Sequence, residues 1–65
     1  MVTNRTVVMA ENGVVLIEVT LVDGVFEIET WYVVRTRRTA SVLDFDDREA
    51  AEQAFRDEVQ RCRAA

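Results

Sequence analysis

Residues 8–34 read VMAENGVVLIEVTLVDGVFEIETWYVV, and this stretch decides the fold. Two dipeptides, Asn12-Gly13 and Asp23-Gly24, each separate runs that are rich in β-branched and aromatic residues. Both dipeptides accept positive φ angles at the two central positions, as a two-residue type I′ turn requires. The stretch therefore predicts three consecutive antiparallel strands joined by two tight hairpins.

The two turns also predict which side chains share a face of the sheet, because tight turns fix the register of the strands they join. Counting outward from each turn gives the pairs Glu11 with Val14, Ala10 with Val15, Met9 with Leu16 and Val8 with Ile17, and then Val22 with Val25, Leu21 with Phe26, Val19 with Ile28, Leu16 with Trp31 and Val14 with Val33. The face expected to meet a helix carries Val8, Ala10, Val15, Ile17, Val19, Leu21, Phe26, Ile28, Tyr32, Leu43 and Phe45.

A fourth strand is predicted over residues 40–45, after a connection (residues 36–39) without Gly or Asn that we expect to be looser. From Asp46 the apolar period becomes helical, and Asp46 with Glu49 resembles a capping box. One apolar helical stripe consists of Ala51, Ala54, Phe55, Val59 and Cys62. We therefore expect an α+β fold, a single β-β-β-β-α domain over residues 1–65. It would be a four-stranded antiparallel β-meander followed by one C-terminal amphipathic helix packed on one sheet face.

The size of the chain limits how it can be stabilised. A domain of 65 residues buries only about 60% of the surface of its unfolded chain, so a monomer is marginal. One cysteine, Cys62, excludes an internal disulfide, and the absence of histidine excludes the usual zinc ligands. Oligomerisation or a protein partner remains, and we expect no cofactor and no metal.

Charge and hydropathy limit the partners and the cellular compartment that we expect. The net charge of −4 disfavours nucleic acid and anionic membranes. No apolar stretch reaches the roughly 20 residues that span a bilayer, and residues 1–5 lack the pattern of a signal peptide. A lone cysteine without an export signal is typical of a reducing compartment, so we expect a cytoplasmic protein without membrane contact.

The face expected to lie away from the helix is not the polar surface of a solvated sheet. Its apolar members are Val7, Met9, Val14, Leu16, Trp31, Val33 and Val42. A contiguous apolar patch on so small a chain is typical of an interface, although β-branched residues also occur in strands simply because they suit them. These seven residues are the predicted interface, with a second copy of the chain, another protein or both.

The sequence offers few residues that could carry out catalysis. There is no His and no Lys for general acid–base chemistry, and both glycines are placed in turns. The acidic run of residues 44–49 has the residue types that bind Mg²⁺ or Ca²⁺, but a helix N-terminus explains it better. Cys62, on the apolar stripe and without an activating His, is interpreted as a small buried hydrophobic residue. We expect no enzymatic activity.

Trp31, Arg35, Arg37 and Arg38 form the one basic and aromatic run. Trp31 and Arg35 fall on the same face, an arrangement that allows stacking on a nucleic-acid base. The alternative interpretation is that Arg35 packs along Trp31 while Arg37 and Arg38 solvate a loop. A small single-stranded nucleic-acid-binding module is therefore the second hypothesis.

The predicted topology is similar in outline to that of Pur repeats, which bind single-stranded nucleic acid, and of WGR domains. The Trp-Gly-Arg signature is absent, because Trp31 is followed by Tyr32, and glutamates take the place of the basic sheet face of Pur repeats. No functional residue is carried over from either family. The leading hypothesis is a small non-catalytic protein–protein interaction module, homodimeric, of the inhibitor, modulator or small-subunit type.

Overall fold

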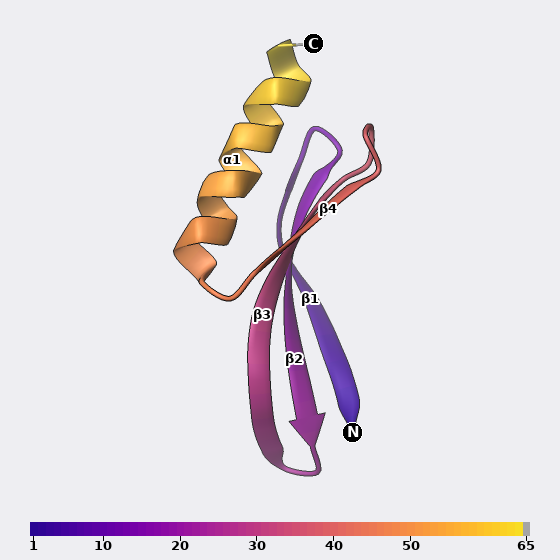
Figure 1. Cartoon of the computed structure of the whole chain (residues 1–65). Helices are drawn as coiled ribbons and strands as arrows, with labels where there is room; N and C mark the ends of the chain where they lie inside the picture. The colour runs from indigo at the N-terminus through magenta and orange to yellow at the C-terminus, as the bar shows by residue number, and fades with distance from the viewer. Residues whose placement is uncertain (65) are drawn as a thin grey trace.

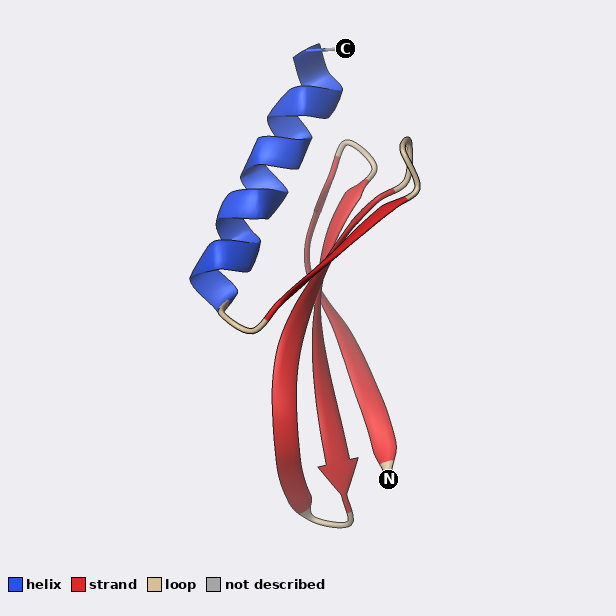
Figure 2. Cartoon of the chain, in the orientation of Figure 1, coloured by secondary structure: helices blue, strands red, loops and turns tan. Residues whose placement is uncertain are grey.

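The computed structural model describes residues 1–64 and confirms the predicted fold class (Figure 1). Four antiparallel strands form one sheet in the order β1-β2-β3-β4, and one helix follows them. The elements are β1 (Val2–Glu11), β2 (Val14–Asp23), β3 (Phe26–Thr36), β4 (Ser41–Phe45) and α1 (Arg48–Ala64). The helix packs against one side of the sheet, as Figure 2 shows. No helix in this part of the chain is long and apolar enough to cross a membrane.

The first hairpin has the predicted turn. Asn12 and Gly13 take φ angles of 52° and 77°, the pair of positive values that a type I′ turn needs. The predicted register holds as far as Met9 opposite Leu16. Beyond it a β-bulge at Val8 places Val7, and not Val8, opposite Ile17. The prediction for Val8 is wrong, because an inserted residue shifts every pair beyond it by one.

The second hairpin turns one residue later than predicted. Asp23 lies opposite Phe26, so Gly24 and Val25 are the central residues of the turn. Gly24 has a φ of 63° and Val25 has no positive φ, which fits a type II′ turn with Gly in its first central position. A second bulge follows, with Ile28 as the inserted residue between Glu27 and Glu29.

The predicted register between β2 and β3 therefore differs from the observed one by an odd number of residues. Leu16 lies opposite Val34 instead of Trp31, and Trp31 lies opposite Val19. Side chains alternate between the two faces along a strand, so an odd shift changes which residues of β2 share a face with residues 29–36 of β3.

The helix covers the face that carries the even-numbered residues of β2, where Val14 and Leu16 are fully buried. The buried core consists of Val14, Leu16, Val34, Ala51, Phe55 and Val59, and Val8, Met9, Tyr32, Phe45, Ala54 and Cys62 pack around it. The predicted helical stripe is confirmed. The predicted sheet face is wrong in β2 and at Ala10, because Val15, Ile17, Val19 and Leu21, with Ala10 opposite Val15, lie on the side away from the helix.

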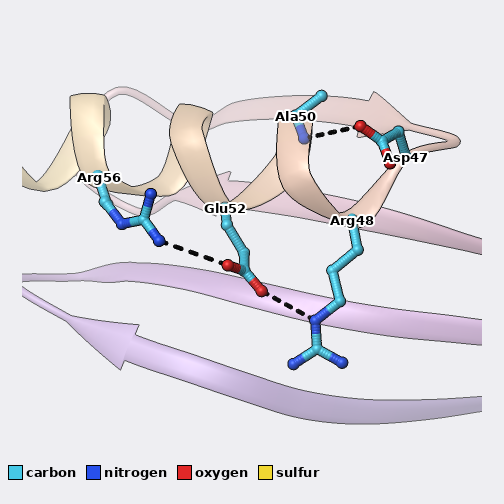
Figure 3. Close-up of polar contacts among 5 residues, drawn as sticks. All are labelled: Asp47, Arg48, Ala50, Glu52 and Arg56. Carbon is cyan, nitrogen blue, oxygen red and sulfur yellow. Dashed lines mark hydrogen bonds and ion pairs between the residues drawn. The ribbon is translucent and has the colours of Figure 1, made fainter.

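The helix begins one residue later than the predicted capping box. The carboxylate of Asp47, not of Asp46, accepts a hydrogen bond from the amide of Ala50 at 3.2 Å (Figure 3). The Glu52 carboxylate then forms ion pairs with Arg48 and Arg56, at N···O distances of 2.9 and 3.4 Å. The hydrogen bond to Glu52 raises the pKa of Arg48, which is charged in any case at all ordinary pH values.

The helix covers only one end of the sheet. Its first turn follows β4, whose last residue, Phe45, lies opposite Tyr32 near the middle of β3. From there the helix runs back toward the Asn12-Gly13 turn, as Figure 1 shows. The other end of the sheet, residues 2–6, 18–23 and 26–31, projects past the helix as a three-stranded extension, here called the β-arm. The molecule is correspondingly long, 44 × 19 × 15 Å.

Candidate interaction face

The face of the sheet opposite the helix, called the open face below, has an apolar centre that runs the length of β2. It follows from alternation along each strand, with Ile17 opposite both Val7 and Val33, and Val19 opposite both Arg5 and Trp31. Its apolar residues are Val7, Val15, Ile17, Val19, Leu21, Trp31, Val33 and Val42. Its charged residues are Arg5, Glu29, Arg35 and Asp44.

The open face is accessible and uneven. Val7 and Val42 are 61% and 57% exposed, whereas Val19 beneath its neighbours is 3% exposed. Two hollows of about 540 and 340 Å³ lie on it, and Ile17, Arg35 and Val42 line both. The shared residues make the hollows one continuous depression, in which aliphatic side chains form most of the floor.

The charges of the open face separate along the strands. Arg35 belongs to the end near the Asn12-Gly13 turn, and Arg37, in the loop beside that end, lines the larger hollow. Glu29 lies in the β-arm at the other end, opposite Leu21, and Asp23 lies at the tip of the same end. Asp44 lies at the first end and Arg5 in the β-arm, so the separation is one of net charge. The first end is net positive, with Arg35 and Arg37 against Asp44, and the β-arm is net negative, with Glu29 and Asp23 against Arg5.

The arginines of the sheet differ from those of the helix. Arg48, Arg56, Arg61 and Arg63 of α1 each form an ion pair with a glutamate. Within residues 1–64, Arg5, Arg35, Arg37 and Arg38 form none. The helix arginines are thus used within the fold, and the sheet and loop arginines remain available to another molecule.

The structure divides the seven predicted interface residues between the two faces. Val7, Trp31, Val33 and Val42 lie on the open face, as predicted. Val14 and Leu16 are 0% exposed under α1, and Met9 packs against the same core, so these three belong to the interior. Val15, Ile17, Val19 and Leu21 take their place, because the register shift exchanges the two faces of β2.

The predicted nucleic-acid contacts are partly brought together. Trp31 and Arg35 share the open face with Val33 between them, and Arg5 lies across the sheet from Trp31. Arg37 lines the larger hollow, and Arg38 is exposed in the loop. Arg5 was not predicted, although its place seven residues before Asn12 could have put it in the first strand.

The helix side holds one buried carboxylate that the sequence patterns did not single out. Glu58 is 6% exposed, accepts a hydrogen bond from the Thr36 hydroxyl at 3.1 Å and pairs with Arg61 at 2.7 Å. Its position three residues after Phe55 on the apolar stripe was the available signal. The hydrogen bond joins α1 to the end of β3 and the ion pair lies within α1, so the carboxylate stabilises the fold.

The other candidate chemical groups have structural positions. Asp47 of the acidic run caps the helix, and Cys62 is half-buried against the core. Across residues 1–64, no three His, Cys, Asp or Glu side chains gather in a way that could hold a metal ion. The open face is therefore the candidate functional site.

Comparison with protein-family models, with curated proteins and with solved structures gives no significant match to any of them.

Proposed function

We propose that this chain is a small non-catalytic protein-interaction module that binds its partner through the open face of its sheet. One observation supports this most directly: the helix packs on one face, while the other carries a continuous apolar centre that no other element of residues 1–64 covers. Antiparallel sheets with one solvated face normally alternate apolar and polar residues, and β2 does not. Its residues from Val14 to Ile17 are apolar on both faces.

The apolar residues of the open face gain from a partner in proportion to the area that leaves water, about 25 cal/mol per Å². An exposed patch of this kind is usual at binding surfaces and unusual on isolated small domains. Trp31 near the middle of the patch is of the residue type most enriched at interaction hot spots. The fixed sheet backbone also means that little order must be gained on binding.

Dye binding and sedimentation test the proposal. At high dilution the chain should bind an apolar fluorescent dye, and concentration or a partner should suppress that signal by covering the face. Val42→Asp, on the face, should reduce dye binding and association severalfold. Val25→Asp is the matched control, because Val25 is 89% exposed in the turn outside the patch. A chain that stays monomeric at micromolar concentration and binds no dye would contradict the proposal.

A second candidate function is the binding of single-stranded nucleic acid. The observation in its favour is that Trp31, Arg5 and Arg35 share one accessible face and that neither arginine is in an ion pair within residues 1–64. An aromatic ring with free guanidinium groups is the usual platform for stacked bases. Glu29 and Asp44 on the same face oppose it, which is why it stands second.

Fluorescence of Trp31 tests this second function. A single-stranded oligonucleotide should quench the emission at low salt, and the quenching should fade as salt displaces the phosphate contacts. Arg35→Ala should weaken the effect severalfold, while Arg56→Ala on the helix should leave it unchanged. Unchanged emission at low salt with excess oligonucleotide would remove nucleic acid as a ligand.

A further inference from the structure

The separation of charge on the open face limits how a second molecule can pack on it. Arg35 and Glu29 both lie on β3 and both face away from the helix. They stand three residues on either side of Tyr32, which pairs with Glu18 of β2. Both residues are exposed, and neither forms an ion pair in the described part of the chain. Along β3 the face therefore carries one positive and one negative group placed symmetrically about its middle row, while its other two charges, Arg5 and Asp44, lie on β1 and β4.

Two copies of one sheet can stack face to face about a two-fold axis that lies in the plane between them. An axis parallel to the strands brings the basic ends together, which costs free energy through repulsion of like charges. An axis perpendicular to the strands brings the basic end of one copy over the acidic end of the other. The charge pattern selects the perpendicular axis.

We infer that a second copy of this chain occupies the open face, related by a two-fold axis that crosses the strands above the row of Glu18 and Tyr32, so that Arg35 of each copy pairs with Glu29 of the other. This inference rests on the proposed function and names its partner. Apolar complementarity follows from the same axis, which sets Ile17 over Val19 of the second copy and Val33 over Trp31. Packed sheets of this kind cross at about 30°, so neighbouring rows meet.

The available area fits a dimer. Three strands of about ten residues present roughly 34 × 14 Å, or about 500 Å² per copy as a flat surface. The pair would bury about 1,000 Å², before the relief of the side chains is counted, which reaches the size at which specific interfaces begin. A second layer would also cover the β-arm, which α1 does not reach.

Opposite charge reversals test the arrangement. Arg35→Glu places two acidic pairs in its own homodimer, and Glu29→Arg places two basic pairs in its own. Each change should raise the dissociation constant at least tenfold. In an equimolar mixture of the two variants, both cross-sheet pairs are restored with reversed sign, so the heterodimer should form in preference to either homodimer. Native mass spectrometry separates the three species by mass.

The control mixture combines Arg38→Glu with Glu29→Arg. It reproduces the difference in net charge, but Arg38 lies in the loop outside the face, so a smaller preference for the heterodimer is expected. Circular dichroism checks that each variant is folded; unfolding of either would move the test to the milder pair Arg35→Gln and Glu29→Gln, each of which should weaken the dimer severalfold.

The outcomes separate this inference from the function on which it rests. A wild-type dimer whose charge-reversed variants show no more preference for each other than the control pair would overturn the two-fold arrangement and leave the interaction face intact. A wild-type chain that is monomeric at about 100 µM would overturn the second copy as occupant. In that case dye binding would still support another protein, and quenching of Trp31 would indicate nucleic acid.

Discussion

At the scale of single residues, the loop between β3 and β4 contains one residue in an unfavourable backbone conformation. The sequence offers no Gly or Asn there, yet the turn Arg37–Ala40 closes with Ala40 at a φ of 54°. A left-handed alanine costs roughly 1–2 kcal/mol relative to its ordinary conformation. The loop is held all the same, because the Arg37 amide donates to the Gly13 carbonyl at 2.9 Å and the Ala40 amide to the Arg37 carbonyl at 3.3 Å.

Ala40→Gly should therefore raise the free energy of unfolding by about 0.5–1 kcal/mol, since glycine adopts this φ without strain but loses more chain entropy on folding. Urea denaturation measures the change. Thr39→Gly is the control, because Thr39 has no positive φ and should gain nothing. Equal effects at the two positions would show that the strain at Ala40 is not a significant cost.

The buried contact between Thr36 and Glu58 gives a second prediction at this scale. Thr36→Val should lower the free energy of unfolding by about 1–3 kcal/mol, because the Glu58 carboxylate would lose a buried hydrogen bond that water cannot replace. In a chain that carries Glu58→Met, the same substitution should cost much less. A double-mutant cycle by urea unfolding measures the coupling between the two sites. A coupling near zero would mean that the hydrogen bond does not stabilise the fold.

At the scale of elements, the start of the helix is decided between two adjacent aspartates. Asp47 caps α1 through the Ala50 amide, and Asp46 makes no hydrogen bond to the first turn. Asp47→Ala should lower the free energy of unfolding by about 1 kcal/mol, the usual cost of a lost N-cap. Asp46→Ala removes the same charge near the same helix end and should cost clearly less. The reverse order would restore the predicted cap at Asp46.

The registers show what could be predicted from the sequence and what could not. The Asn12-Gly13 turn, the order of the strands and the helical stripe are encoded locally, through φ preferences and a one-sided apolar period, and all three are confirmed. The bulges at Val8 and Ile28 have no such signal, because neither position carries a glycine. Each bulge inserts one residue and exchanges the faces beyond it.

The candidate site was predictable only in outline for the same reason. Along β2 the run from Val14 to Ile17 is apolar on both faces, so alternation could not decide which residues α1 would cover. The packing of the helix decides it, by burying Val14 and Leu16 and leaving Val15 and Ile17 on the open face. The excess of apolar surface was evident from the sequence. Which residues of β2 belong to the exposed face, however, depended on where the helix packs.

At the scale of the whole molecule, the sheet is longer than the layer that covers it. Domains are normally two packed layers, because each layer buries its apolar side against the other. The half of this sheet near the Asn12-Gly13 turn meets that rule through α1, whereas the β-arm is a single layer in the isolated chain. In the β-arm, Phe26 and Ile28 are 72% and 52% exposed. The arm therefore depends on its hydrogen bonds and on its connection to the covered half.

Hydrogen exchange along β2 should reveal this difference in a dilute, monomeric solution. β2 is paired on both sides along its length, so its two halves differ in cover rather than in pairing. Amides of residues 18–22 should exchange at least tenfold faster than those of residues 14–17, because opening the arm exposes little that α1 buries. At concentrations where the chain associates, protection should rise in residues 18–22 and change less in residues 14–17. Equal protection of the two halves in the monomer would show that the arm opens only when the whole domain unfolds.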